Sequence, residues 1–186
     1  VRKKVLALLK RFPYLNSVGV ETRPNLLSQS KLLATVNELP SSVRHLTVGF
    51  GFECITDIVR DVCINKGYGR KEMARAVATI DAVKGLTPNV TLEFEVYVML
   101  KPIFLSEQEA IDEAVATIEW CYDIGAETAV LFLNTVKTNT VQHFFASEPL
   151  LPSDIKFRPP FYRSAIRALL ELPPQRRQMT AVLGVQ

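Results

Sequence analysis

Apolar and polar residues alternate along four segments of the chain, and each segment is followed by apolar residues at helical spacing. Alternation with period two predicts β-strands over residues 15–21, 46–53, 90–100 and 128–134. Apolar residues three and four positions apart predict the intervening helices. Strands that alternate with helices are typical of parallel sheets with right-handed crossovers. We therefore expect an α/β fold built from four strand–helix units.

Several residues mark where the predicted helices begin, end or bury their apolar sides. An amphipathic helix over residues 1–12 should end before Pro13. Asn25 is expected to cap the second helix, Gly85 and Gly125 to end two later ones, and Ser106 with Glu109 to form a capping box. The buried positions expected in two further helices are Ile55, Ile58, Val59 and Val62, then Ile166, Leu169 and Leu170.

Each predicted strand has one apolar face and one face of small or polar residues. In residues 46–53, Leu46, Val48, Phe50 and Phe52 face one way, and Thr47, Gly49, Gly51 and Glu53 face the other. A flat parallel sheet covered on both faces would instead give continuous apolar runs. We therefore predict a partial parallel (β/α) barrel, whose outer face packs on helices and whose inner face lines a hollow.

The inner face carries small and charged residues. Gly19, Gly49 and Gly51 leave room where a filled barrel would place Val, Ile or Leu. Alternatively, these glycines mark bulges or points of close packing. Glu93 and Glu95 argue against a dry interior, because an unpaired buried carboxylate is costly.

Four polar residues stand at the carboxyl ends of the predicted strands, where parallel α/β sheets bind ligands. They are Glu21, Glu53, Lys101 and Asn134. A helix cap, a helix-start contact or a solvated charge would explain any one of them, but their corresponding positions favour a shared site. Lys101 also leaves open a lyase or aldolase that uses its amine as a Schiff-base nucleophile.

Composition narrows the class of protein. The chain has 186 residues and a net charge of +3, too small to indicate nucleic-acid binding alone. It lacks the roughly 18-residue apolar run of a membrane span and a signal peptide, so we expect no membrane association. Cys54, Cys63 and Cys121 have no metal-ligand spacing and are expected to be reduced thiols of a cytoplasmic protein.

The ends of the chain suggest how it is organised. It begins at Val1, with neither an initiator Met nor a helix cap, which suggests a piece excised from a longer protein. Residues 1–186 are expected to form one domain, with residues 173–186 as a loose tail.

Motifs near the strand ends resemble a known superfamily. Four segments resemble the middle of a radical S-adenosylmethionine (SAM) enzyme core, namely Val18–Pro24, Val48–Glu53, Asp57–Arg60 and Ile64–Gly67. Such a core is a TIM-barrel-like (β/α)6 half-barrel with its cofactor at the open mouth. Within this superfamily, three segments are similar to the archaeosine synthase radical-SAM subunit family, namely Cys63–Gly67, Leu100–Ala110 and Arg158–Phe161. That family modifies a deazaguanine base in tRNA. Within the superfamily, the chain would form the C-terminal portion of the core.

The resemblance implies an iron–sulfur oxidoreductase that cleaves SAM to a deoxyadenosyl radical. It places Glu21 and Glu53 near the amino or ribose groups of SAM, and Lys101 and Asn134 near the adenine and the substrate. It gives Arg60 and Lys66 a supporting role near the ribose and carboxylate, although Arg60 could equally be a surface residue.

The chain departs from this family in two motifs that bear directly on chemistry. It lacks the metal-binding C-x-x-x-C-x-x-C motif, whose three thiolates hold a 4Fe-4S cluster. It also lacks the glycine-rich motif that follows the second strand of such a core. SAM and the 4Fe-4S cluster are therefore expected in a full-length parent and not on this chain, which alone should be inactive. The alternative is a non-catalytic binding or scaffold domain on the same half-barrel. Expected partners are tRNA or a small-molecule substrate, and further copies of the chain through an exposed sheet edge.

Overall fold

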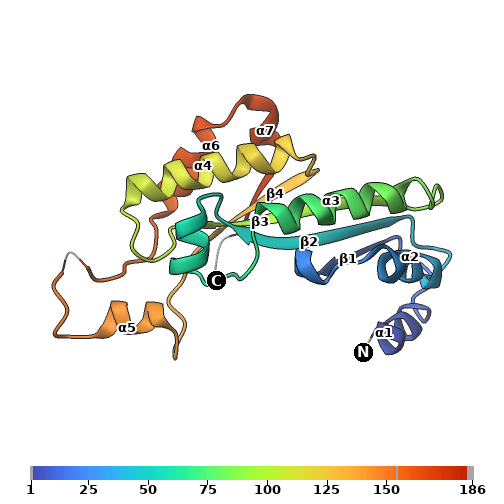
Figure 1. The fold of residues 1–186 in the computed structure, drawn as a ribbon, viewed down its shortest axis with the longest axis horizontal. Coiled ribbons are helices and arrows are strands. Elements are labelled where there is room, and N and C mark those ends of the chain that lie inside the picture. Colours follow the sequence, from blue (N-terminus) through green and yellow to red (C-terminus); the bar gives the residue numbers. More distant parts are fainter. Residues whose placement is uncertain (1, 154, 184–186) are drawn as a thin grey trace.

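The structure is a computed structural model that describes residues 2–153 and 155–183. Five parallel strands form one sheet in chain order (Figure 1). They are β1 (Ser17–Glu21), β2 (His45–Glu53), β3 (Thr91–Leu100), β4 (Thr128–Leu133) and β5 (Thr180–Leu183). The first four coincide with the four segments of alternating residues. The predicted α/β class, with a partial parallel (β/α) barrel, is therefore confirmed.

The helices connect successive strands, and the larger ones cover one face of the sheet. They are α1 (Arg2–Leu9), α2 (Gln29–Glu38), α3 (Arg70–Lys84), α4 (Glu107–Asp123), α5 (Val141–Ser147), α6 (Tyr162–Glu171) and α7 (Pro174–Gln178), with short turns η1 (Pro24–Leu26) and η2 (Val59–Cys63). In Figure 1, α3 and α4 run along the same side of the sheet, and α6 packs on α4. None of the described helices combines the length and the apolar character needed to cross a bilayer.

The hydrophobic core lies between the sheet and these helices. Leu46, Val48, Phe50 and Phe52 of β2 are fully buried, and the Phe50 ring lies 6.2 Å from that of Phe94 on β3. Burying an aromatic side chain of this size contributes about 2–3 kcal/mol. On the opposite face of β3, every second residue from Glu93 to Met99 is only partly buried. The structure thus confirms that one face is buried and the other open.

Gly49 and Gly51 lie on this open face, beneath polar side chains. The strand register places Gly49 between Glu21 of β1 and Glu95 of β3. A Cβ atom at Gly49 would lie 2.9 Å from the Tyr97 ring, and one at Gly51 would lie 2.8 Å from Glu53 Oε1. The register is irregular between Gly51 and Glu53. The alternative interpretation, a bulge and close packing, is therefore correct for these two glycines.

The segment after β2 differs from the predicted amphipathic helix. It contains a π-turn, η2. Ile58, which precedes this turn, is 67% exposed, and Val62 within it is 69% exposed, so their predicted burial is wrong. Arg60 is buried instead, at 2% exposure. A π-turn is wider than an α-turn and is common at functional sites. The hydrogen bonds that Arg60 makes when buried stabilise this segment more than the burial of Ile58 and Val62 would.

Two further helix predictions need correction. Asn25 lies inside η1 and does not cap α2, which begins after Ser28. In α6, Ile166 and Leu170 are mostly exposed, whereas Ser164, Ala165 and Ala168 are buried. α6 thus packs on α4 while its small residues are buried, and small residues allow two helices to approach closely.

Other predicted helix ends are confirmed. Ser106 and Glu109 form the capping box of α4. Gly85 follows α3 directly as its C-cap, and Gly125, with φ of 93°, follows α4 in the left-handed conformation that glycine adopts readily.

The C-terminal residues that the structure describes are ordered elements, so the predicted loose tail is wrong for them. α7 is held by Arg176, which donates to the Glu119 carbonyl at 2.9 Å and to Asp123 at 2.5 Å. β5 then pairs in parallel with β4. The edge of β4 supplies unpaired backbone groups, which a following strand can satisfy. Residues 184–186 of the predicted tail lie outside the described part of the chain.

Candidate functional site

A groove of about 730 Å³ opens at the carboxyl ends of the strands, and we call it the Glu53 groove. The first four strands each contribute to its lining, together with the segments after β1, η2 and β4. The lining residues are Glu21, Thr22, Arg23, Leu26, Gly51, Glu53, Lys66, Tyr68, Tyr97, Phe132 and Lys137. Glu21, Glu53 and Lys66, three of the residues that the sequence singled out, therefore meet in one place.

Glu53 is the last residue of β2 and lines this groove. Its backbone is left-handed, with φ of 72°, and the residue is only 6% exposed. Oε1 accepts a hydrogen bond from Lys66 Nζ at 2.5 Å, whereas the buried Oε2 has no partner among the described residues. Leaving such an oxygen unsatisfied costs about 1–3 kcal/mol. Oε2 is thus suited to a hydrogen-bond donor supplied from outside the chain.

The charge state of Glu53 follows from its surroundings. Burial raises the pKa of its carboxyl, the Lys66 ammonium partly opposes this shift, and the Glu21 carboxylate adds to it. A cationic donor bound at Oε2 would lower this pKa again. The site therefore gains electrostatically from a bound ammonium group or from another strong donor.

Two residues that the sequence analysis did not select, Arg23 and Tyr68, lie against Lys66, whose Nζ is 5.9 Å from the centre of the Tyr68 ring. Arg23 Nη2 donates to the Lys66 carbonyl at 3.0 Å, and its guanidinium lies 5.2 Å from the centre of the Tyr68 ring. The Tyr68 hydroxyl donates to the carbonyl of Gly51. Burial and the nearby Glu53 raise the pKa of Tyr68 to about 12, so the phenol stays protonated at neutral pH.

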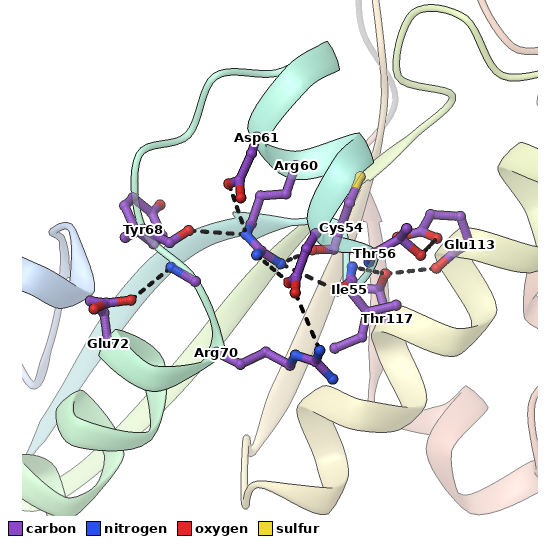
Figure 2. A network of polar contacts seen from close by, with 12 residues as sticks. Cys54, Ile55, Thr56, Arg60, Asp61, Tyr68, Arg70, Glu72, Glu113 and Thr117 are labelled. Carbon is purple, nitrogen blue, oxygen red and sulfur yellow. Dashed lines mark hydrogen bonds and ion pairs between the residues drawn. The ribbon is translucent and has the colours of Figure 1, made fainter.

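Arg60 fastens the segment that carries these residues (Figure 2). Its Nε donates to the Tyr68 carbonyl at 3.0 Å, and Nη1 donates to the carbonyls of Cys54 and Ile55, each at 3.2 Å. Nη2 pairs with Asp57 at 2.5 Å. Since the guanidinium joins both ends of residues 54–68, it closes this segment into a fixed loop. Arg60 has a structural role and does not line the Glu53 groove.

The loop is also anchored to the helices on either side. Thr56 donates to the Glu113 carboxylate of α4 through its backbone N–H, at 2.8 Å, and its hydroxyl, at 2.6 Å. Asp57 also pairs with Arg70 of α3, at 3.4 Å. The hydrogen bond from Arg60 is the main cause that lowers the pKa of Asp57. The loop position, and with it that of Lys66, thus depends on both helices.

An acidic strip on the inner sheet face adjoins the Glu53 groove. The Tyr97 hydroxyl donates to Glu95 Oε1 at 2.9 Å. Burial, together with the carboxylates of Glu95 and Glu21, raises the pKa of Tyr97. The groove lining combines the carboxylates of Glu21 and Glu53 with three cations, namely Arg23, Lys66 and Lys137. Such a mixture suits a ligand that carries both signs of charge.

Lys101 and Asn134 lie at neighbouring strand ends but do not line the Glu53 groove. Lys101 Nζ forms an ion pair with Glu107 of α4 at 2.6 Å and is only 12% exposed. Asn134 donates to the Lys101 carbonyl at 2.8 Å and accepts from Gln142 at 3.1 Å. An amine held in this ion pair is not presented to a carbonyl substrate, which argues against the Schiff-base alternative.

Glu107 joins β3, α4 and α6. Besides Lys101, it accepts hydrogen bonds from the Phe161 N–H at 2.9 Å and from Ser164 Oγ at 2.5 Å. Burial alone would raise its pKa, but these donors and Lys101 lower it below the ordinary value. Lys101 therefore helps to connect the helices at this end of the sheet.

Sequence reasoning did not select seven lining residues of the Glu53 groove. Only some of them carried a usable signal. Tyr97 alternates with the apolar residues of β3, and Phe132 alternates in the same way in β4. Thr22 and Arg23 follow Glu21 closely, whereas Leu26, Tyr68 and Lys137 had no such mark. The seven are Thr22, Arg23, Leu26, Tyr68, Tyr97, Phe132 and Lys137.

The described cysteines do not fit an iron–sulfur cluster. Cys54 and Cys121 are buried, Cys63 is partly buried, and all three are free thiols. Burial raises the pKa of each thiol, which disfavours the thiolate that ligates metal. Among residues 2–153 and 155–183, no group of three or more His, Cys, Asp or Glu residues could hold a metal ion.

Sequence comparison finds similar archaeal proteins. The chain is 28% identical to archaeosine synthase subunit beta of Methanosarcina acetivorans, over 90% of this chain and 44% of that protein. It is 27% identical to the subunit of the same name from Thermococcus kodakarensis, over 91% and 47%. An uncharacterized protein of Methanocaldococcus jannaschii is 28% identical, over 92% and 42%. The chain thus spans less than half the length of these relatives. No family model matches it.

Structural comparison identifies the fold. The radical SAM methyltransferase TsrM from Kitasatospora setae, solved with cobalamin and a 4Fe-4S cluster bound, superimposes with a TM-score of 0.53. The match covers 99% of this chain and 43% of TsrM, at 10% identity. The fold is thus found in a radical SAM enzyme, and the two comparisons confirm the resemblance that the motifs indicated.

Replacing Arg60 should destabilise the protein strongly. In Arg60→Ala, Asp57 and the carbonyls of Cys54, Ile55 and Tyr68 lose their donor, and the free energy of unfolding should fall by about 3–5 kcal/mol. Arg60→Lys should recover only part of this stability, because a single ammonium group cannot donate to all the acceptors that the planar guanidinium reaches. Urea denaturation measures each value. The exposed Arg167→Ala should change stability by less than about 0.5 kcal/mol; an equal loss in both variants would contradict the assigned role.

Stability should depend on pH through Glu53. Because its folded pKa lies above the ordinary value of 4.5, its stabilising contribution is complete below that pH and is lost as pH rises through the folded pKa. Glu53→Gln keeps a neutral side chain at every pH. The stability of the original protein relative to this variant should therefore decrease as the pH rises above 4.5, as measured by urea unfolding at a series of pH values. An increase over that range would show that the pKa is lowered.

Proposed function

We propose that this chain is the C-terminal portion of a radical SAM core, and that its Glu53 groove binds SAM in the whole protein. The observation that carries the proposal is Glu53 Oε2, a buried carboxylate oxygen without a described partner at the carboxyl ends of a parallel sheet. The fold shared with TsrM and the sequence similarity to archaeosine synthase subunit beta support the same assignment.

The lining of the groove fits the chemical groups of SAM. The methionine part of SAM carries an ammonium and a carboxylate, and its sulfur is cationic. Glu53 Oε2 can accept a hydrogen bond from the ammonium or from a ribose hydroxyl, and Glu21 adds a second carboxylate. Arg23 and Lys137 offer cations to the ligand carboxylate. Leu26 and Phe132 provide apolar surface for the adenine ring.

This part of the protein binds and orients, and it does not perform redox chemistry itself. In a radical SAM enzyme, bound SAM supplies the radical chemistry by which hydrogen is abstracted from a substrate. The described cysteines do not fit the cluster that this chemistry needs, so we assign the cluster to a part of the whole protein outside this chain. Lys66 holds Oε1 of Glu53 and directs Oε2 to the ligand, while the Arg60 loop keeps Lys66 in position.

The substrate that we propose for the whole protein is a base in tRNA. The similarity to two proteins named archaeosine synthase subunit beta supports this assignment. The name of these relatives also suggests a partner subunit. β1, an edge strand whose residues are mostly exposed, is a second place where another strand or another copy can pair. The free thiols are consistent with the predicted cytoplasmic location.

Glu53→Gln should weaken SAM binding by the whole protein about 10- to 100-fold, because the neutral amide replaces a charge-assisted acceptor. Equilibrium dialysis with radiolabelled SAM, under anaerobic conditions, measures the affinity. Glu171→Gln removes an exposed carboxylate on α6 and serves as the matched control, with unchanged affinity. If Glu53→Gln binds SAM as well as the original protein does, SAM does not occupy this groove.

The whole protein, reconstituted anaerobically with iron, sulfide and a reductant, should form 5′-deoxyadenosine from SAM. Chromatography of the products measures this directly. Loss of the product in Glu53→Gln, with the cluster absorbance intact, is expected because SAM is then poorly held. An original protein with an intact cluster that binds SAM but forms no 5′-deoxyadenosine would favour the non-catalytic binding domain.

A further inference from the structure

A second groove, of about 640 Å³, lies beside the carboxyl end of β3, and we call it the Phe104 groove. Its walls come from the loop between β3 and α4, from α5, and from the irregular segment around Lys156. In Figure 1, α5 and this segment extend away from the sheet as an arm. This groove shares no lining residue with the Glu53 groove.

Two phenylalanine rings form an aromatic surface in the Phe104 groove. Phe104 is 59% exposed, and its backbone is left-handed, with φ of 71°. Bulky residues adopt this conformation rarely, and such outliers cluster at functional sites. The Phe104 ring packs edge-on against Phe145, with 4.9 Å between the ring centres. The structure therefore maintains an exposed aromatic ring in a disfavoured backbone conformation, an arrangement that offers a ring face to a planar ligand.

The charge of the Phe104 groove is positive. Lys156 and Arg158 have no hydrogen-bond or ion-pair partner among residues 2–153 and 155–183. The acidic residue in the lining, Glu109, is engaged by the Ser106 N–H at 2.8 Å in the capping box of α4. Lys101 is neutralised by Glu107. Two cations thus remain available to an anionic ligand.

We propose that the Phe104 groove binds a single-stranded segment of RNA, with a base stacked on Phe104 and phosphates held by Lys156 and Arg158. Unpaired bases stack on exposed aromatic rings while Lys and Arg hold the backbone, which is how many proteins bind single strands. An acidic protein partner would satisfy the cations but would leave the strained, exposed ring unexplained. This inference rests on the proposed function in tRNA modification and deepens it.

The position of the groove suits a substrate next to a cofactor. The end of β4 lies close to both grooves. Phe132 lines the Glu53 groove, and Asn134, just after β4, donates to the carbonyl of Lys101, which lines the Phe104 groove, and accepts from Gln142 of α5. RNA held along the arm would thus be delivered to the same rim of the sheet. The hydrogen bond from Gln142 to Asn134 joins α5 to that rim.

The test is fluorescence anisotropy of the whole protein with a fluorescein-labelled, single-stranded RNA of mixed sequence. The double variant Lys156→Ala, Arg158→Ala should weaken binding at least about 10-fold at low salt. It should also reduce the slope of log affinity against log salt by about 0.7 for each phosphate that is no longer neutralised. Phe104→Leu keeps an apolar side chain but removes the ring, and it should weaken binding about 5- to 100-fold with an unchanged salt slope.

Matched controls come from α1 and the turn that follows it, at the far end of the molecule from α5 in Figure 1. The double variant Lys3→Ala, Lys4→Ala and the single variant Phe12→Leu change exposed residues of the same kinds and should bind RNA normally. Circular dichroism and urea unfolding confirm that each variant is folded. Wild-type RNA affinity in the Lys156, Arg158 variant, or equal losses in these control variants, would overturn the proposal. Tighter binding of an acidic protein than of RNA would also overturn it.

SAM binding separates this inference from the proposed function. The Lys156, Arg158 variant should bind SAM normally, and Glu53→Gln should bind RNA normally. If SAM binds as proposed but RNA affinity does not depend on Phe104, Lys156 and Arg158, only the RNA inference fails. If RNA binding follows these residues but SAM does not bind, only the assignment of the Glu53 groove fails.

Discussion

The buried guanidinium of Arg60 is the interaction on which the candidate site depends. It donates to carbonyls at the two ends of the Cys54–Tyr68 segment and pairs with Asp57, so one side chain closes the loop (Figure 2). A buried charge is tolerated only when hydrogen bonds replace its lost hydration. These acceptors exist only when the loop is closed. The burial of Arg60 and the closed shape of the loop therefore require each other. The Glu53 groove can bind a ligand only when both are in place.

The closed loop brings Lys66 and Tyr68 to the end of β2, where Glu53 is held in a left-handed backbone conformation. The result is a carboxylate that is paired on one oxygen and unsatisfied on the other. Such an arrangement sacrifices stability locally, and the well-packed face of the sheet tolerates this because Phe50, Phe52 and Phe94 contribute to the core independently of the groove. Stability and ligand binding are thus assigned to opposite faces of one sheet.

The same division explains why two grooves occur at one rim. The helices cover the outer face, so polar side chains can gather only on the inner face and at the carboxyl ends of the strands. The Glu53 groove combines both signs of charge, whereas the Phe104 groove is aromatic and cationic. A small zwitterionic ligand and a polyanion would therefore select different grooves, although both would lie at the same rim.

The sequence by itself determined four of the strands, most of the helices, the open face of the sheet and the meeting of Glu21 and Glu53 at neighbouring strand ends, because periodicity and parallel topology follow from local patterns. Lys66 was named only through the family resemblance, and Lys101 and Asn134, expected at the same site, lie outside the Glu53 groove. The sequence did not determine that Arg60 is buried in place of Ile58 and Val62, or that β5 joins the sheet. It also did not reveal that Tyr97 and Phe132 share a groove with Arg23. Those outcomes depend on hydrogen bonds and contacts between residues far apart in the chain, and only the tertiary structure brings such residues together.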